Sequence, residues 1–439
     1  MYKSLNNLLS SFVLKFLGIL IIFLPLQTLF QSYLERFFCN QSFVFWLSHW
    51  YEPIAAIFLI LVVIGNFTKK EIAIDKYYLI VGALIDFGIL SAIFISPSIS
   101  RGLEGFRFTL FASLIFFIIM LVDVRKGDFE KLVKSYLTIS VIVAIWAIVE
   151  RVLPMNYWQH LGLSDFGFGQ HKVVEVYQSQ SIFQGSNQLA SYLLPAIFIM
   201  IKIVEERYKS QVTNNKQISI LKSQFSNIIF TLVMIAALIL TFSRSAFVGL
   251  AIGLVVYAII SIKLVRLKYL AIALIVALIA FLYVLSNAPS RVISDLFSHG
   301  ASHEQHLSAL RLSIDEVKDR FQTDTLKFTF GSGLGTAGPS VLKYGDGFVS
   351  ESWYLQLIIE IGIFGLALWL FLMYYLLRDL VKENKGLFLG LLSVSVAALF
   401  LHTWADNPAL AITLFILMGI AVKETRNKKQ RYKQITNLK

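Results

Sequence analysis

The chain is poor in cysteine and in charge. Cysteine occurs once in its 439 residues, at Cys39, which excludes an internal disulfide and a metal cluster built on cysteine. Charged residues make up only 15% of the chain, whereas hydrophobic residues make up 57%. The sequence also lacks a Walker loop, a dinucleotide-binding fingerprint, internal repeats and low-complexity tracts, so nothing in it indicates ATP. The composition therefore favours a protein embedded in a membrane.

What the sequence has is a series of long apolar runs. Most are roughly 17 to 22 residues long, the length that crosses the hydrocarbon core of a bilayer as an α-helix. We therefore predict an all-α polytopic membrane protein with about twelve transmembrane helices. The first run has no small-residue cleavage pattern after it, so we interpret it as a retained span and not as a removed signal peptide. The predicted spans are 12–30, 52–66, 77–96, 106–124, 131–150, 183–203, 225–241, 245–262, 269–286, 353–377, 386–402 and 408–422.

Lysine and arginine are concentrated in alternate connections between these spans, which predicts that both termini lie in the cytoplasm. This distribution explains the formal net charge of +12. We interpret the basic tail as an anchor on an anionic leaflet rather than as a nucleic-acid-binding arm, and we expect no nucleic-acid partner. The predicted parts are spans one to six (1–204), a cytoplasmic linker (205–224), spans seven to nine (225–286), a large extracytoplasmic loop (287–352), spans ten to twelve (353–422) and the tail (423–439).

The large loop is where we expect chemistry, because it is the longest polar segment outside the apolar runs. Apolar residues recur in it at spacings of three and four between Glu304 and Phe321, which predicts a helix of about five turns. We expect this amphipathic helix to lie against the membrane surface or the mouth of a helix bundle and to present Arg311 on its polar side. A run with four glycines, Gly331–Pro339, follows, and such a run permits positive φ angles and close approach of backbones.

Two arginines are candidate anion-binding residues. Arg244 lies in the tight outer turn Thr241–Gly249 between two apolar helices, where an arginine is costly unless it meets an anion or reaches the interface. It either stabilises the turn by snorkelling or clamps a phosphate or pyrophosphate, for which its planar guanidinium is suited. Arg311 either pairs with Asp315 along the helix or binds an anion, and both alternatives are open at this point.

Several carboxylates lie at different predicted depths. Glu351, at the outer boundary of a span, either flanks the helix or accepts a proton from a hydroxyl group. Glu360 lies roughly 13 Å deeper, which favours an internal structural hydrogen bond over a role as the reacting base. Asp86 is an intramembrane carboxylate and would be the first residue to test in a proton-coupled transporter. We interpret His402 and Asp406 as structural, because no further metal ligands accompany them.

Four blocks carry a resemblance to a known family. They are Ser181-Ile-Phe-Gln-Gly-Ser-Asn-Gln-Leu-Ala-Ser-Tyr192, Thr241-Phe-Ser-Arg-Ser-Ala246, Arg311 followed by Gly331-Ser-Gly-Leu-Gly335, and Glu351-Ser-Trp-Tyr-Leu-Gln356 followed by Glu360-x-Gly-x-x-Gly365. In order, spacing and topology these blocks resemble the O-antigen ligase and polymerase superfamily of bacterial polysaccharide assembly. The first block departs from the family pattern by lacking its proline and by carrying glutamine where an arginine often precedes it. The last block carries Glu351 where ligases of the family have a histidine, and this favours a polymerase.

The resemblance implies a fold similar to the C-type glycosyltransferases and a transferase that works outside the cytoplasmic membrane. The implied donor is a growing glycan on undecaprenyl diphosphate, and the implied acceptor is a repeat unit on the same lipid. Arg244 and Arg311 are then the residues expected to bind the diphosphate without a metal or another cofactor, and Glu351 is the expected base. Asn187, Gly333, Gly335 and Tyr354 are expected to shape the substrate cleft. Trp158, Tyr177, Tyr344 and Trp353 either stack on sugars or anchor the chain at the interface.

Two other functions are open. A ligase of the same superfamily would transfer finished glycan to a different acceptor. A flippase or other transporter would also have many spans, but it would need no long outer loop and would place its charges around a central cavity. The polymerase reading implies membrane lipids as surroundings, with a flippase and a chain-length regulator as partner proteins.

Overall fold

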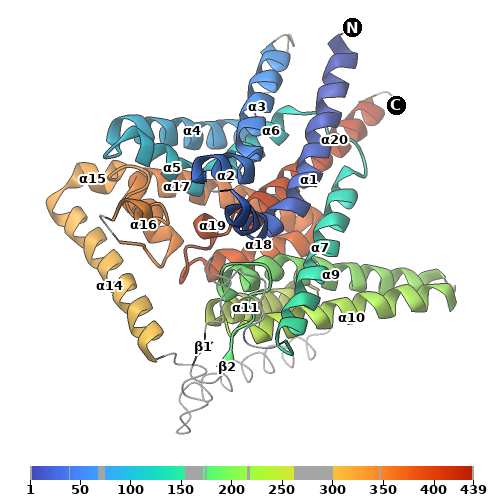
Figure 1. Cartoon of the computed structure of the whole chain (residues 1–439). Helices are drawn as coiled ribbons and strands as arrows, with labels where there is room; N and C mark the ends of the chain where they lie inside the picture. The colour runs from blue at the N-terminus through green and yellow to red at the C-terminus, as the bar shows by residue number, and fades with distance from the viewer. Residues whose placement is uncertain are drawn as a thin grey trace. The chain divides into compact units, whose positions relative to one another are not determined.

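The computed structural model describes residues 2–38, 40–67, 75–153, 172–173, 176–214, 218–261, 300–345 and 348–437. These residues are almost entirely helical (Figure 1), apart from a small antiparallel pair of strands, β1 (Lys172–Val173) and β2 (Val176–Tyr177). Seven of the described helices are long and apolar enough to cross a membrane, and there are nine if each of two bent pairs counts as one span. A polytopic helical membrane protein, as predicted from the apolar runs, is therefore confirmed.

The chain forms two compact units, and each is assembled from separated stretches of sequence. Unit 1 contains Met1–Tyr136, Ser313–Asn384 and Trp404–Lys439, and unit 2 contains Leu137–Leu312 and Lys385–Thr403. Helices α7 (Asp128–Glu150) and α14 (Gly300–Thr323) each have residues in both units.

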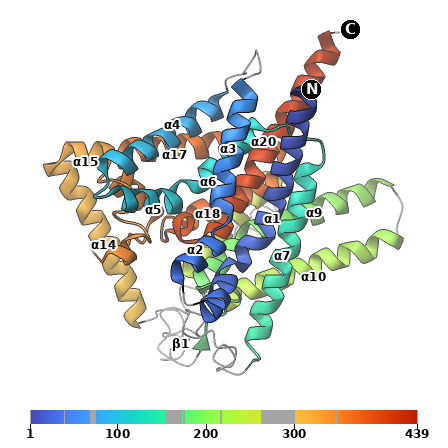
Figure 2. The same cartoon turned by 45° about the horizontal axis from the view of Figure 1, so that its top comes forward.

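Unit 1 is built on α4, α6, α17 and α20. Helix α20 packs against α6, and it also lies alongside α1 (Figure 2) and contacts α17. Helix α17 packs against α4 and against α15. The bounds of the unit 1 helices are α1 (Tyr2–Phe37), α2 (Gln41–Ser48), α3 (Tyr51–Phe67), α4 (Lys76–Leu90), α5 (Ile99–Thr109), α6 (Phe111–Leu121), α15 (Thr325–Phe330), α16 (Val341–Tyr344), α17 (Trp353–Glu383), α19 (Thr403–Asp406) and α20 (Pro408–Asn437), with a π-helical turn η1 (Ser91–Ile95) after α4.

The core of unit 1 contains a cluster of aromatic side chains. The ring of Trp369, in the middle of α17, lies 5.2 Å from that of Trp353, 5.5 Å from that of Trp404 and 5.8 Å from that of Phe415 between centroids. The three pairs meet edge-to-face or tilted, which are favoured geometries for aromatic rings. Trp353 and Trp369 are fully buried, so Trp353 belongs to the core and its surroundings favour neither sugar stacking nor interfacial anchoring.

Unit 2 brings α9 (Ser186–Asn214), α10 (Ile218–Leu240), α11 (Arg244–Ser261) and α18 (Lys385–Ala397) together. Helices α9 and α10 run side by side (Figures 1 and 2), and α18 packs against α9 and α11. Glycines permit this close packing, because a Cβ atom on Gly249 would lie 2.5 Å from the carbonyl oxygen of Ser393, and one on Gly390 would lie 2.7 Å from Cα of Pro195. Small residues at such contacts are typical of helices packed in membranes.

The predicted spans correspond to helices in most places, but not all of them are straight or long. The predicted span 106–124 corresponds to a bent pair of helices, α5 and α6, which meet at an angle of 63°. The spans 225–241 and 386–402 correspond to the shorter apolar helices Ser226–Leu240 and Lys385–Ala397. The span 269–286, Cys39 and Trp158 lie outside the described residues, as do the first residues of the predicted outer loop.

Candidate functional site

The glycine-rich segment Gly331–Pro339, here called the glycine loop, is bound to a break in α17. The helix is interrupted at Gly362, whose φ and ψ are 68° and −177°, so the carbonyl groups before it lose their usual partners four residues later. The loop supplies replacements. Ser332 N–H donates to the carbonyl oxygen of Ile359 at 2.9 Å, and Gly333 N–H donates to that of Glu360 at 3.0 Å. Arg320 from α14 also donates to the Ile359 oxygen, at 2.8 Å.

Glycine is required where these two backbones meet. Gly331 has a φ of +84°, and a Cβ atom there would lie 2.3 Å from the carbonyl oxygen of Glu360. A Cβ atom on Gly362 would lie 2.2 Å from the carbonyl oxygen of Thr329. Neither position has room for a side chain, and both use a φ that other residues rarely adopt. Two of the sequence blocks, the glycine loop and the segment 351–365, therefore form one packed structure.

The side chain of Glu360 lies at the centre of this structure and is fully buried. Its Oε1 accepts hydrogen bonds from the backbone N–H groups of Gly335 at 3.1 Å and Ala337 at 3.3 Å. Its Oε2 accepts from the Thr109 hydroxyl at 2.9 Å and from the Gln356 amide at 3.3 Å. All four donors are neutral. The sequence-based prediction that Glu360 makes an internal structural hydrogen bond is confirmed.

Helix α5 and the turn before it support the other side of the glycine loop. Arg101, only 5% exposed, donates through Nε to the carbonyl oxygen of Gly335 at 2.8 Å. Ser96 donates to the carbonyl oxygen of Leu334 at 3.0 Å. Gly333 and Gly335 are both buried with positive φ, and Cβ atoms there would lie 2.3 Å from Cα of Ser96 and 2.6 Å from the carbonyl oxygen of Arg101. Packing alone accounts for glycine at both positions, so their predicted contact with substrate stays a prediction.

Further along α5, charged residues at a spacing of three contact other parts of unit 1. Glu104 accepts from Lys343 Nζ at 2.8 Å and from the hydroxyl of Tyr344 at 3.1 Å. Arg107 Nε pairs with Glu52 at 2.5 Å. These residues were not predicted from the sequence, because hydropathy divides the segment between a connection and a single span. The charges at positions 101, 104 and 107 were the available signal, because that spacing repeats along one side of a helix.

In unit 2 the structure brings together the first two sequence blocks. The hydroxyl of Ser243 donates to Oδ1 of Asn187 at 2.7 Å, which joins the turn before α11 to the first turn of α9. Phe242 in this turn has a φ of 52°. Arg244 is the first residue of α11 and is half-buried, so its guanidinium lies at a helix N-terminus, where the partial positive charge of the helix adds to its own.

A buried carboxylate that sequence reasoning missed holds the start of the first block. Glu150, the last residue of α7, is 7% exposed, and its Oε2 accepts from the backbone N–H groups of Gln180 at 3.2 Å and Ser181 at 2.8 Å. Ser181 has a φ of 55°, and its hydroxyl donates to the carbonyl oxygen of Val143 at 3.0 Å. A glutamate at the end of an apolar run is an ordinary flanking residue, so the sequence carries no specific signal for this role.

The predicted helix in the large loop is confirmed as α14, with a different buried face. Arg311 is exposed, as predicted, and its side chain makes no hydrogen bond or ion pair with any residue that the structure describes, so the predicted alternative of a pair with Asp315 is not formed. The predicted apolar stripe is largely exposed, with 67% of Phe321 accessible, whereas Ser313 and Arg320 are buried. The exposed stripe suits a membrane surface better than packing within unit 1.

The remaining predicted residues lie near the start of α17. Glu351 is half-buried and precedes the helix by two residues, and Tyr354 is half-buried in the first turn. These two residues belong to unit 1, as do Gly333 and Gly335. Arg244, Arg311 and Asn187 belong to unit 2.

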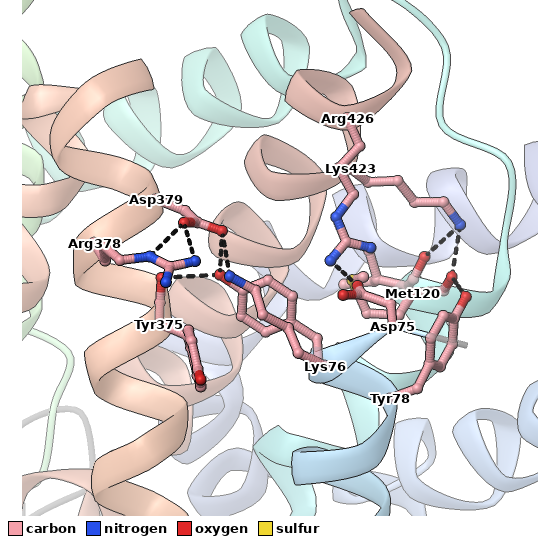
Figure 3. Close-up of polar contacts among 11 residues, drawn as sticks. Asp75, Lys76, Tyr78, Met120, Tyr375, Arg378, Asp379, Lys423 and Arg426 are labelled. Carbon is pink, nitrogen blue, oxygen red and sulfur yellow. Dashed lines mark hydrogen bonds and ion pairs between the residues drawn. The ribbon is translucent and has the colours of Figure 1, made fainter. Parts of the chain in front are cut away.

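At the end of unit 1 away from the glycine loop, several charged residues meet (Figure 3), and we call Asp75, Lys76, Arg378, Asp379 and Arg426 the ion-pair cluster. Asp379 accepts from Lys76 at 2.9 Å and from Arg378 at 3.1 Å, and Asp75 pairs with Arg426. These residues come from the start of α4, the end of α17 and the middle of α20. Three segments that the charge distribution predicts to lie on one side of the membrane therefore meet at one end of unit 1.

Lys423 caps the C-terminus of α6 at the same end of unit 1. Its ammonium donates to the carbonyl oxygens of Met120 at 2.7 Å and Ile119 at 3.3 Å, and also to that of Val122 (Figure 3 shows Lys423 beside Met120). These carbonyl groups lie at the C-terminus of α6, where a positive charge also meets the negative end of the helix dipole.

The other polar candidates form no metal site in the described part of the chain. That part contains no group of three or more His, Cys, Asp or Glu side chains that could hold a metal ion. His402 is half-buried in unit 2, whereas Asp406 belongs to unit 1. Asp86 lies on the exposed side of α4, away from the buried residues of that helix.

The chain matches no protein-family model and no curated protein sequence. The resemblance to the O-antigen ligase and polymerase superfamily therefore rests on the four sequence blocks themselves.

Proposed function

We propose that the protein polymerises lipid-linked oligosaccharide repeat units for an O-antigen, capsule or exopolysaccharide at the outer face of the bacterial cytoplasmic membrane. The observation that carries this proposal is the hydrogen bond between Ser243 and Asn187, which joins two of the family-like blocks and places Arg244 at the start of α11. An arginine at a helix N-terminus, beside serine hydroxyl groups, has the chemistry to bind a phosphate or diphosphate.

In the proposed reaction, a hydroxyl oxygen of the acceptor repeat unit attacks the anomeric carbon of the donor glycan. The bond from that carbon to undecaprenyl diphosphate breaks, and the lipid diphosphate leaves with the bonding electrons. Arg244 and Arg311 bind the diphosphate and stabilise the charge that develops on it. Glu351 accepts the proton of the attacking hydroxyl. Asn187, Gly333, Gly335 and Tyr354 are the proposed substrate-binding residues, and the reaction needs no metal or other cofactor.

The same proposal includes about twelve spans, with both termini cytoplasmic and residues 287–352 outside. The meeting of Lys76, Arg378 and Arg426 at one end of unit 1 supports this topology, because lysine and arginine concentrate on the cytoplasmic side. The glycine loop contacts Ser96, beyond the opposite end of α4, as the topology requires. A flippase and a chain-length regulator are the proposed partner proteins.

A ligase is the second candidate, because it would share the same blocks and the same diphosphate-binding arginines. Glu351 in place of the family's histidine favours the polymerase. The transporter is less favoured, because Asp86, its first candidate residue, lies on the exposed side of α4.

The test is the lipid-linked glycan profile of cells that lack the protein, complemented with wild type, Arg244→Ala or, as a matched control, Arg378→Ala from the ion-pair cluster. We expect a single lipid-linked repeat to accumulate in the deletion and with Arg244→Ala, and a ladder to return with wild type and Arg378→Ala. Lipid-linked polymer that accumulates without reaching its final acceptor would indicate a ligase. A repeat trapped on the inner leaflet would indicate a transporter and would remove these residues from catalysis.

A further inference from the structure

A cleft in unit 2 lies among α9, α10 and α11, away from the turn that carries Arg244. Its volume is about 330 Å³, which is within the range of small-molecule sites. Its apolar wall consists of Ile201 and Val204 from α9 and Ile228 and Leu232 from α10. Leu232 is 60% exposed, so this wall is open on one side. A hydrocarbon chain can therefore pack along this apolar wall.

The cleft also has a polar part, which an ordinary lipid-facing groove would lack. It is formed by Glu205, Tyr257 and Thr231. The Glu205 carboxylate accepts from Lys202 Nζ at 2.9 Å and from the Tyr257 hydroxyl at 3.4 Å, and it also pairs with Lys209. Two carboxylate oxygens offer about four acceptor positions, and hydroxyl oxygens keep acceptor capacity when they donate. The polar part therefore presents oxygen acceptors to a ligand that brings N–H donors.

The charges around the cleft select for a ligand without net charge. Within the ion pairs beside the cleft, Lys202 and Lys209 are balanced by Glu205 and by Glu206, which lies 3.6 Å from Lys202, whereas the neighbouring Arg207 is exposed and does not line the cleft. An anionic ligand would add an unbalanced negative charge to this set, and a simple cation would add an unbalanced positive charge. A zwitterion adds one charge of each sign. Its cationic group can face Glu205, while its anionic group faces Lys209, whose side chain is 63% exposed.

We propose that this cleft binds a phospholipid with a primary ammonium headgroup, of the phosphatidylethanolamine type. The ammonium donates to the Glu205 carboxylate and to the hydroxyl oxygens of Tyr257 and Thr231. The lipid phosphate lies beside Lys209, and an acyl chain lies along the wall formed by Ile201, Val204, Ile228 and Leu232. A trimethylated headgroup has no N–H donor and binds less well, and an anionic headgroup has no cation for Glu205.

The experiment is lipid binding to the purified full-length protein by native mass spectrometry, with phosphatidylethanolamine, phosphatidylcholine and phosphatidylglycerol of identical acyl chains. We expect phosphatidylethanolamine to bind at least about tenfold more tightly than either of the others. Glu205→Gln should reduce that binding about tenfold. The matched control is Glu206→Gln, which removes the same charge one residue away, on a side chain that is 66% exposed and does not line the cleft.

Three results would overturn the proposal: equal binding of the three lipids, preference for phosphatidylglycerol, or equal losses in Glu205→Gln and Glu206→Gln. If Glu205→Gln does not fold, Tyr257→Phe tests the same claim, because it removes one acceptor and should weaken binding of the ethanolamine lipid alone. Lipid binding is measured without any glycan, so its outcome is independent of the polymerase proposal.

Discussion

The two ends of α17 hold their carboxylate groups in different ways. Near its start, Glu360 is fully buried and bound by four neutral donors, two of them backbone N–H groups. Near its end, Asp379 retains 33% of its side-chain exposure and is shared between Lys76 and Arg378 (Figure 3). The hydrogen bonds of Glu360 require backbone N–H groups at fixed positions. Asp379 instead pairs with two flexible side chains, and one of them can still pair with it when the other is lost. We therefore expect the glycine-loop end to tolerate far less change than the ion-pair cluster.

The largest expected effect comes from Glu360→Ala. It leaves the N–H groups of Gly335 and Ala337 and the Thr109 hydroxyl without the Glu360 acceptor in a buried place, and each such loss costs about 1–3 kcal/mol. We expect about 3–5 kcal/mol of lost stability in denaturant unfolding of the detergent-solubilised protein.

Glu360→Gln should lose clearly less than Glu360→Ala. It keeps one acceptor oxygen, and the Gln356 Oε1, which is buried without a hydrogen-bond partner among the described residues, can accept from the new amide. Equal losses in the two variants would show that the hydrogen bonds of Glu360 do not hold the glycine loop.

The next prediction compares two glycine substitutions, one that adds only backbone strain and one that also adds a steric clash. Gly331 and Gly345 both have positive φ, but a Cβ atom would meet the Glu360 carbonyl at the first position and nothing within 4 Å at the second. Gly345→Ala should therefore cost only the conformational strain, about 1–2 kcal/mol. Gly331→Ala should cost more than about 4 kcal/mol in the same unfolding experiment. Similar values for the two would contradict the close approach of the loop to α17.

The ion-pair cluster should give a smaller, salt-dependent effect. A double-mutant cycle of Lys76→Met and Asp379→Asn should report a coupling of about 0.5–1 kcal/mol, because both side chains are roughly one-third exposed and Arg378 also pairs with Asp379. The coupling should fall in 1 M salt. Lys382→Met, on the exposed last turn of α17, is the control and should change little. If the coupling between Lys76 and Asp379 were as large as the stability lost in Glu360→Ala, the expected difference between the two ends of α17 would be contradicted.

The smallest effect is expected at an exposed helix cap. Asp324 accepts from the backbone N–H of Lys327 at 3.0 Å at the start of α15, and this bond and the Lys327 ammonium hold its pKa below the ordinary value. Because the folded-state pKa is lowered, the stabilisation is present above the unfolded-state pKa of about 3.9 and is lost as the pH falls through the folded-state value.

Asp324→Ala should therefore lower the melting temperature slightly at pH 7, and the difference from wild type should shrink at pH 3. A difference that stays constant between these two pH values would contradict the role of the ionised carboxylate.

The comparison also shows which features the sequence could predict. Hydropathy and charge predicted the helical membrane class and placed Lys76, Arg378 and Arg426 on one side, because these properties depend on composition along the chain. The depth of Glu360 predicted its internal hydrogen bonds. The bend between α5 and α6 could not be predicted in this way, because partners far along the chain, such as Gly335 for Arg101, fix the position of α5.

The candidate site was predictable in part for the same reason. The blocks around Asn187 and Arg244 were found because their residues are close in sequence, and the structure joins them by one hydrogen bond. Glu150 and Arg101 were missed because their roles consist of contacts with backbone groups, which any sequence can supply.

The most direct test of the proposed polymerase is made with the purified protein in liposomes that contain one synthetic repeat unit on undecaprenyl diphosphate. The account predicts a ladder of lipid-linked oligomers and release of undecaprenyl diphosphate, with no added divalent metal and with loss of both products in Arg244→Ala. Single repeats that remain unchanged while wild-type protein is folded and correctly inserted would contradict the account.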